Sequence, residues 1–420
     1  MHLKNNMIYK SEYAYIDSIV FVTGHYPPPE NAAGFRLRAM VKAILKNLNM
    51  NVLIIDLARS KVEQYIGDYG EKIISPRVSH PSGSKLYYFY RLKNMIDLSK
   101  TYYLINKCIR KLSLKPRLII STIPPGESVE IGLKLARQYE AKLLIDFHDL
   151  TDEWKIAENP LLGAFYKWYF NKYVYGVLDK ADAITATTEY AVHYIRRKTK
   201  GRIKRIFVIY NGVHPSDFNK AYAMKTKGYS DELRIIFVGN LNWKYHKLDL
   251  FIKAMKEIDL KKYKFKFVII GKGKYLNSYI SLAKKLNLEK RITFTGYVTR
   301  QKLLDELGRS DFGLIPRPNI NNPWVIASDR ITFYEYLASG MPVIAYGPDI
   351  NYMGYIIEKY GLGIYIRSND HKFIASKIIE NIDYLTSIHS SYIRNYILKY
   401  RDWDKIMNKF INIIQRILFT

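Results

Sequence analysis

The strongest constraint on the fold is an alternation of short apolar runs with amphipathic stretches, which occurs twice along the chain. Short apolar runs between turn residues are typical of buried strands, whereas apolar residues at helical spacing are typical of helices that cover a sheet. Strands that alternate with helices form parallel sheets. The alternation therefore predicts an α/β fold, and its two occurrences predict two domains of similar build with a cleft between them.

The expected elements follow from these patterns. In the first half we expect strands at 16–22, 51–56, 117–121, 142–146, 183–186 and 205–209, and helices at 34–47, 98–112, 127–139, 161–178 and 189–198. Residues 57–97 show no regular pattern. In the second half we expect strands at 233–238, 266–270, 291–295, 312–315, 342–345 and 363–366, with helices between them.

The domain boundary is expected near residue 215, where turn residues at 210–215 precede a polar, unpatterned stretch at 220–231. Apolar residues at helical spacing between 403 and 417 predict an amphipathic terminal helix that packs back on the first domain. The sequence thus predicts a first domain at 1–215, a second domain at 216–397 and a terminal helix at 398–420.

The charge balance is strongly basic, with 66 Lys and Arg against 38 Asp and Glu in 420 residues. The resulting positive electrostatic potential attracts phosphates, whether of nucleic acid, anionic lipid or a nucleotide, and does not discriminate among them. The abundance of Tyr, Ile, Lys and Asn is equally explained by a compositional drift of the source genome. The charge alone therefore assigns no partner.

Several classes of site and location are disfavoured by the composition. One cysteine, Cys108, excludes an internal disulfide and a cysteine metal cluster. The nine histidines show no metal-ligand spacing. No apolar run reaches the roughly 18 residues of a spanning helix, and the N-terminus lacks the apolar segment of a signal peptide. We therefore expect a cytoplasmic protein.

The stretch 328–346 combines a helix with a buried strand. Ser328 and Asp329 are residue types that cap helix N-termini, Gly340 provides the stop, and 343–345 is apolar. Glu335 falls beside the apolar face of this helix, where a carboxylate is costly unless it is hydrogen-bonded. Two interpretations remain open. Either Glu335 turns outward to water, or it is aimed at ligand hydroxyls while the helix N-terminus faces an anion.

Five segments together resemble glycosyltransferase family 4. They are residues 24–45, I-D-F-H-D at 145–149, N-G-V at 211–213, F-V-G-N at 237–240 and E-Y-L-A-S-G-M-P-V-I at 335–344. The resemblance implies a GT-B fold, with two Rossmann-like domains and a nucleotide-sugar in the cleft between them. It also implies transfer of a sugar to an acceptor hydroxyl, with the anomeric configuration retained and the departing phosphate as the base.

Such a reaction needs stabilisation of a leaving diphosphate, either by a metal or by fixed dipoles and cations. The sole D-x-D pattern, Asp402-Trp403-Asp404, lies at the start of the terminal helix and is a poor metal site. We expect no metal and no cofactor. Gly34 precedes a helix, so backbone amides there can approach an anion, and Arg36 follows closely. The alternative is a turn glycine with solvated arginines.

A second phosphate contact is expected at Gly239, which follows the strand at 233–238. The family often carries an Arg after this Gly and a Lys a few residues later. Here Asn240 replaces the Arg, and Lys247 is the preferred cation, with Lys244 behind it. Another glycine-rich turn at 271–273 is interpreted as structural or as a lining of the base pocket.

The helix at 328–340 also departs from the family pattern, which has two glutamates eight residues apart. The first falls on Ala327, so the usual sugar contact is missing, and the resemblance leaves Glu335 as the ribose contact. A related subgroup carries a Lys where this chain has Thr332. Arg330 lies two residues earlier and could reach the phosphate from the first turn.

The strand that carries Ile145 ends near Asp146, which places His148 and Asp149 at the edge where α/β sheets build their sites. The resemblance makes His148 the contact to the sugar near the anomeric carbon, with Asp149 beside it toward the acceptor. The alternative is a His-Asp pair that only caps the loop.

Two basic and aromatic regions predict that the first domain docks on anionic lipid. Residues 85–115 hold eight Lys and Arg against one acid, and residues 165–207 hold ten against three. Aromatic rings suit the headgroup level, and each basic residue near an anionic surface contributes about 1 kcal/mol. The alternative is that the aromatic residues are core and the lysines a solvated face.

We therefore expect a glycosyltransferase with a nucleotide-sugar donor and a glycan or lipid-linked acceptor, in the cytoplasm or at the inner face of the membrane. A sugar-nucleotide epimerase would need acidic groups on both domains, and no convincing set is found. A basic nucleic-acid-binding protein would explain the charge, but no recognised module is present. An inactive sugar-nucleotide binder is the third alternative, because Ala327 removes an expected carboxylate.

Overall fold

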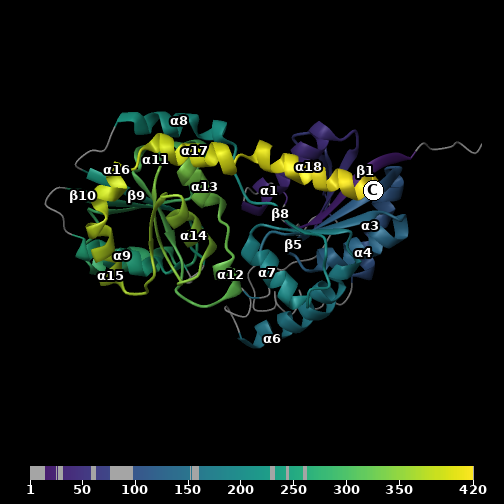
Figure 1. The fold of residues 1–420 in the computed structure, drawn as a ribbon, viewed down its shortest axis with the longest axis horizontal. Helices are drawn as coiled ribbons and strands as arrows, with labels where there is room; N and C mark the ends of the chain where they lie inside the picture. The colour runs from purple at the N-terminus through teal and green to yellow at the C-terminus, as the bar shows by residue number, and fades with distance from the viewer. Residues whose placement is uncertain are drawn as a thin grey trace, which may run out of the picture.

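The structure is a computed structural model and describes residues 15–24, 26, 32–57, 63–75, 98–151, 153, 160–227, 232–242, 246–258 and 263–419. Two α/β domains lie side by side, and the C-terminal helix runs from the second domain across the first (Figure 1). The predicted architecture of two parallel sheets covered by helices is confirmed.

The first domain is built on an eight-stranded sheet in the order β3-β4-β2-β1-β5-β6-β7-β8, parallel except for the antiparallel pair β3 and β4. Its inner strands are apolar along most of their length because helices cover both faces. The strands are β1 (Ile16–Thr23), β2 (Asn51–Asp56), β3 (Glu63–Ile66), β4 (Lys72–Ser75), β5 (Leu114–Ile123), β6 (Lys142–Phe147), β7 (Ala183–Ala186) and β8 (Ile206–Val208). Strands β3 and β4 lie within the stretch for which the sequence showed no pattern.

The helices of the first domain are α1 (Ala32–Asn47), α3 (Ser99–Lys111), α4 (Glu127–Tyr139), α6 (Pro160–Tyr169) and α7 (Glu189–Lys198). The regular helix predicted at 161–178 is wrong beyond Tyr169. The chain continues as a π turn, η1 (Phe170–Val174), and a 3₁₀ turn, η2 (Tyr175–Lys180). This change of period keeps Phe170, Val174 and Tyr175 buried in one cluster.

The second domain is built on a six-stranded parallel sheet in the order β11-β10-β9-β12-β13-β14. Strands β9 and β12 are neighbours although two other strands separate them in the sequence. The strand order therefore reverses between β9 and β12. Such a topological switch point leaves a crevice at the carboxyl ends of the strands. The strands are β9 (Glu232–Val238), β10 (Lys264–Ile270), β11 (Ile292–Gly296), β12 (Phe312–Pro316), β13 (Val343–Tyr346) and β14 (Gly363–Ile366).

The helices of the second domain are α9 (Leu248–Glu257), α10 (Leu276–Lys285), α11 (Arg300–Arg309), α12 (Pro323–Ile326), α13 (Ile331–Ala338), α14 (Tyr352–Lys359), α15 (His371–Glu380), α16 (Ile382–Ser387) and α17 (Ser390–Tyr400). The stretch 220–231, expected to be unpatterned, is helical as far as residue 227. The turns η3 (Pro215–Phe218) and η4 (Met224–Lys227) flank α8 (Asn219–Ala223), and α8 packs on α11.

The chain crosses between the domains twice, and the two crossings are hydrogen-bonded to each other. Val213 donates its N–H to the Arg401 carbonyl at 3.0 Å and accepts from the Trp403 N–H at 3.0 Å. After this crossing α18 (Trp403–Phe419) packs against α1, as expected for a terminal helix that returns to the first domain (Figure 1). The domain limits at 215 and 397 stay predictions.

Helix α13 differs from its prediction in two respects. It begins at Ile331 with Arg330 in the N-cap position, so Ser328 and Asp329 are not its caps. Seven of its eight residues are buried, so the helix has no solvated face. Gly340 ends it with a φ of +77°, a conformation that glycine adopts without strain.

Candidate active site

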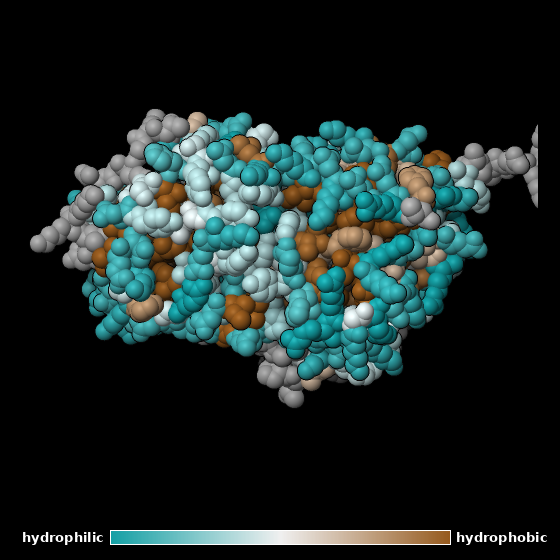
Figure 2. Space-filling view, in the orientation of Figure 1, coloured by the Kyte–Doolittle hydropathy of each residue, from teal (hydrophilic) through white to brown (hydrophobic). Residues whose placement is uncertain are grey.

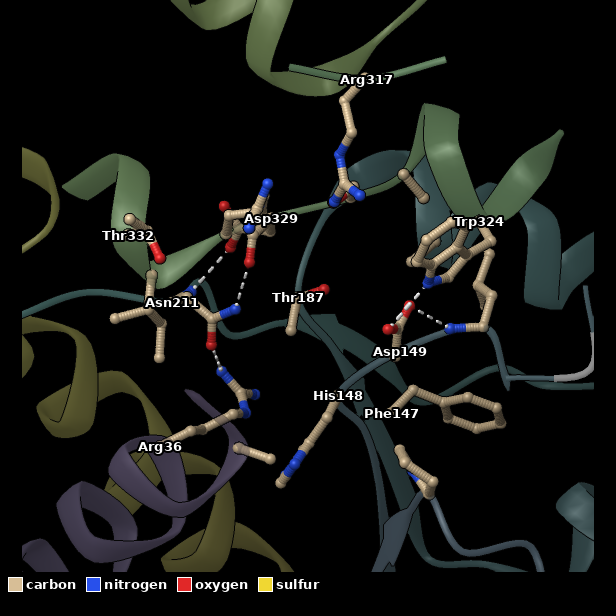
Figure 3. A pocket seen from close by; sticks show the side chains of 18 of the residues that line it. Arg36, Phe147, His148, Asp149, Thr187, Asn211, Arg317, Trp324, Asp329 and Thr332 are labelled. Atoms are coloured by element: carbon tan, nitrogen blue, oxygen red, sulfur yellow. Dashed lines mark hydrogen bonds between the residues drawn. The ribbon is translucent and has the colours of Figure 1, made fainter. Parts of the chain in front are cut away.

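A cavity of about 480 Å³ lies between the domains at the carboxyl edges of the two sheets. The first domain contributes the start of α1 and the residues after β6 and β7, and the second contributes the turn after β9 and the segment 324–332 (Figure 3). Six predicted site residues line it: Arg36, His148, Asp149, Asn240, Arg330 and Thr332. Gly34, Gly239, Lys247 and Glu335 are not among its lining residues.

Arg36 forms a buried ion pair with Asp146. Its Nε and Nη2 atoms donate to the two carboxylate oxygens at 3.0 and 2.8 Å, and the two side chains are 1% and 0% exposed. Nη1 donates to the carbonyls of Ile209 at 2.7 Å and Tyr210 at 3.1 Å, in the segment that leads to the second domain. Arg36 is thus neither solvated nor freely available, and these contacts favour a positioning role over the predicted direct donor contact.

His148 lies against the same carboxylate. Its Nε2 is 2.7 Å from Asp146 Oδ2, and its side chain is 5% exposed. Burial lowers the pKa of His148, with Asp146 opposing and Arg36 reinforcing the shift. Burial alone would raise the pKa of Asp146, but Arg36 and His148 outweigh it and hold that pKa well below its usual value. At neutral pH we therefore assign a neutral imidazole, protonated on Nε2, beside an ionised carboxylate.

Asp149 is held from both domains. One carboxylate oxygen accepts the Leu150 N–H at 2.9 Å, and the other accepts the indole N–H of Trp324 at 2.9 Å (Figure 3). Trp324 belongs to α12 in the second domain. The Asp149 carboxylate therefore contacts both its own loop and the opposite wall of the cavity.

Two arginines of the second domain line the cavity. The buried Arg317 follows β12, donates to the Ser328 hydroxyl and lies 5.1 Å from the Trp324 ring centroid. Arg330 lies at the start of α13. Burial, followed by the charges of Arg330 and Arg317, lowers the pKa of the adjacent His246 well below its usual value. Among the described residues, these two guanidinium groups give the second-domain wall its positive charge.

Glu335 is buried and forms an ion pair with Arg300, whose Nη1 is 2.5 Å from its Oε1. It is therefore not the surface glutamate of the first interpretation. Arg300 also lies over Phe35 of the first domain, at 5.7 Å from the ring centroid. The ribose contact predicted for Glu335 stays a prediction. A ligand that bound the Glu335 carboxylate would share it with Arg300.

The predicted phosphate turn after β9 is shaped by close backbone packing. A Cβ on Gly271 would lie 1.9 Å from the Gly239 carbonyl oxygen, so only glycine fits. This supports the structural interpretation of the 271–273 turn. Asn240 reaches the cavity, whereas Lys247 is exposed and adopts a left-handed φ of 51° before α9. The roles predicted for Gly239, Asn240 and Lys247 stay predictions.

A polar chain joins the domains along the wall of the cavity. Arg36 Nη1 donates to the Asn211 side-chain oxygen at 3.3 Å (Figure 3). Asn211 donates its backbone N–H to the Asp329 carboxylate at 3.0 Å and its side-chain amide to the Asp329 carbonyl at 2.8 Å. These bonds explain why Asp329 does not cap α13. The N-G-V turn therefore connects the Arg36 cluster to the start of that helix.

Sequence reasoning did not select Asp146, Arg317 or Trp324. Arg317 comes directly after a buried strand. The rule that α/β sheets build their sites at the carboxyl ends of strands, which selected His148, would also have selected Arg317. Asp146 carried a similar signal as a charged residue inside an apolar run. Trp324 carried none, because an isolated tryptophan is typical of a core.

The D-x-D pattern lies at the domain crossing. Ligand atoms of His214, Asp402 and Asp404 lie within 4.8 Å of one another, and none of the three lines the cavity. A metal held there would be outside the cavity that the predicted site residues share.

Comparisons with known proteins point to glycosyltransferases. Residues 220–384 match the family model described as glycosyl transferases group 1. An uncharacterised glycosyltransferase of Methanocaldococcus jannaschii is 24% identical over 220 residues, and the match covers 50% of this chain and about half of that protein, 53%.

Solved structures share the fold over nearly the whole chain. The sucrose-phosphate synthase of Thermosynechococcus elongatus has a TM-score of 0.72 at 16% identity and covers 95% of this chain and 98% of its own. The Anabaena protein HepE, solved with UDP and glucose, has a TM-score of 0.65 at 14% identity and covers 96% and 100%. These similarities confirm the GT-B fold that the sequence predicted.

Proposed function

Starting from the glycosyl transferase group 1 domain in residues 220–384, we propose that the protein transfers a sugar from a nucleotide-sugar donor to an acceptor hydroxyl. One observation carries the proposal: a single cavity joins His148 and Asp149 of the first domain to Arg317 and Arg330 of the second. A transferase needs this combination, because polar groups must hold the reacting sugar while cations stabilise the departing phosphate.

The donor diphosphate binds at the second-domain wall. It leaves with about two negative charges, and a water-excluded cavity strengthens their attraction to cations. Arg317 and Arg330 supply two such cations, and the first amides of α13 add their dipoles. The binding of UDP by HepE, on the same fold, supports a nucleotide-containing donor. No metal is needed in this scheme.

His148 contacts the reacting sugar as a neutral group. With the proton on Nε2 toward Asp146, Nδ1 is left as an acceptor for a sugar hydroxyl. The bond between the anomeric carbon and the phosphate oxygen breaks while the acceptor oxygen bonds to that carbon. The departing phosphate takes the acceptor proton on the same face, so the configuration is retained without a protein base.

The test is a panel of UDP-, GDP- and ADP-sugars assayed for hydrolysis and for transfer. Turnover of at least one donor, with free nucleotide as product, is expected. Binding of a donor without turnover would instead support an inactive relative. No binding of any sugar nucleotide, together with salt-sensitive binding of oligonucleotides, would support the nucleic-acid alternative.

We further propose that the acceptor is lipid-linked and that the first domain docks on the inner face of the membrane. None of the helices in the described part of the chain is long and apolar enough to cross a bilayer. On α6, however, Trp168 is 51% exposed, and Lys172 lies over its ring and that of Tyr173 at 5.4 and 5.1 Å. An exposed ring with adjacent lysines suits peripheral binding to anionic headgroups.

The aromatic residues of this region divide into two groups. Tyr166, Tyr169 and Phe170 are core, as the alternative interpretation held, while Trp168 is exposed. The other predicted region, 85–115, lies outside the described residues up to 97. On the face shown in Figure 2, hydrophilic side chains predominate, and apolar ones show between them on both domains. Docking on lipid would therefore be electrostatic and salt-sensitive.

Sedimentation with vesicles tests this docking. Binding to vesicles of acidic lipid is expected at low salt, weakened by Trp168→Ala and by high salt. Equal recovery with neutral and acidic vesicles, or no binding to either, would point to a soluble acceptor.

A further inference from the structure

Helix α12 belongs to the second domain in sequence but is packed into the core of the first. Trp324, Val325 and Ala327 are buried in the same apolar cluster as β5, β6 and α7 residues, and α12 packs against α7. Polar bonds fix the segment on both sides. Thr188 of the first domain donates to the Ala327 carbonyl at 3.3 Å, and Asn351 of the second donates to the Val325 carbonyl at 2.7 Å.

Trp324 contacts both walls of the cavity from this fixed position. Its indole N–H donates to Asp149 Oδ2 at 2.9 Å, and its ring lies 5.1 Å from the Arg317 guanidinium (Figure 3). The ring is buried, so rotation about its side-chain bonds is restricted by packing. The hydrogen bond therefore determines where one Asp149 oxygen points, while the Leu150 N–H holds the other.

We infer that Trp324 is a positioning residue, which orients the Asp149 carboxylate from across the cleft for the transfer step. The inference rests on the proposed function. It follows because Asp149 is exposed on its own loop, and the Trp324 bond fixes its second carboxylate oxygen from the other side of the cleft. Donor and acceptor of this hydrogen bond come from different domains, so the geometry of Asp149 depends on how the two domains pack.

The test uses Trp324→Phe, which keeps a ring for Arg317 and for the apolar cluster but removes the N–H donor. A hydrogen bond to a charged group is worth enough that kcat should fall about tenfold to a hundredfold. The KM for the donor, the affinity for UDP or GDP and the melting temperature should change little. Trp403→Phe, a buried tryptophan outside the cavity, is the control and should leave kcat unchanged.

A double-mutant cycle separates positioning from a merely structural role. If Trp324 acts through Asp149, adding Trp324→Phe to Asp149→Asn should lower kcat no further than Asp149→Asn alone. If the two substitutions lower kcat independently, so that their effects multiply in the double variant, the inference is overturned. An unchanged kcat in Trp324→Phe, or a loss of activity that parallels a fall in melting temperature, would overturn it too. A wild-type protein that turns over no sugar nucleotide would refute the proposed function and the positioning role together. An active wild-type protein with an equally active Trp324→Phe variant would refute the positioning role alone.

Discussion

Replacing Arg36 by Met should destabilise the first domain strongly. Arg36 and Asp146 form a buried bidentate pair, and removing one partner of such a pair costs about 3–5 kcal/mol because the other charge is left uncompensated. For a domain of this size, each kcal/mol lowers the melting temperature by about 2–4 °C. A decrease of about 6–20 °C follows from these two values.

Arg38 provides a matched control on the same helix. Its ion pair with Asp68 spans 3.3 Å, but the two side chains are 26% and 72% exposed. Such surface pairs contribute about 0–1 kcal/mol, so Arg38→Met should lower the melting temperature by less than about 4 °C. Differential scanning calorimetry of the full chain measures both variants.

The pH dependence provides an internal check on Arg36→Met. Arg36 is one of the groups that lower the pKa of His148, so its removal raises that pKa. As the pH falls toward 6, His148 takes up a proton and partly replaces the lost cation beside Asp146. The deficit in stability should therefore be smaller at pH 6 than at pH 8. Equal shifts for the Arg36 and Arg38 variants, or a normal melting temperature with lost donor binding, would refute the structural role and restore the predicted donor contact.

Further predictions concern the donor, the metal and the histidines. Glu335→Gln should weaken donor binding by about 1.5–3 kcal/mol in calorimetric titration, and unchanged affinity would exclude a ribose contact. Transfer should persist in excess EDTA, whereas loss of activity restored by Mn²⁺ or Mg²⁺ would show that a metal stabilises the leaving group. His148→Ala should lower kcat strongly with little change in nucleotide affinity, and a matching fall in melting temperature would indicate loop capping instead. The pKa values of His148 and His246 are lowered by folding, so wild-type stability should fall as the pH drops below the ordinary histidine pKa of about 6.5. His246→Asn should reduce this loss of stability, whereas His193→Asn, at an exposed position, should not. Identical pH profiles of stability for the wild type and both variants would contradict the role of burial.

The sequence alone determined the α/β class, most strand positions and the sheet edge at which the cavity lies. Local periodicity and turn residues suffice for this, because they show which segments are buried and where each strand ends. Strand β14 and helix α7 were predicted at their observed limits. His148 and Asp149 were predicted from the end of one strand, and both line the cavity. The π turn after Tyr169 was missed because several aromatic residues share a buried cluster, which a regular helical period does not describe.

Only the tertiary structure decided which charged and polar groups meet. Arg36 and Asp146 are 110 residues apart, and Asp149 and Trp324 are 175 apart. A local pattern shows that such a side chain is costly to bury, but not which distant segment satisfies it. The same limit applies to Glu335, whose place beside an apolar face was evident while its partner Arg300 was not. Packing inside the first domain brings Arg36 to Asp146, and packing inside the second brings Arg300 to Glu335. Of these pairs, only Asp149 and Trp324 meet across the two domains.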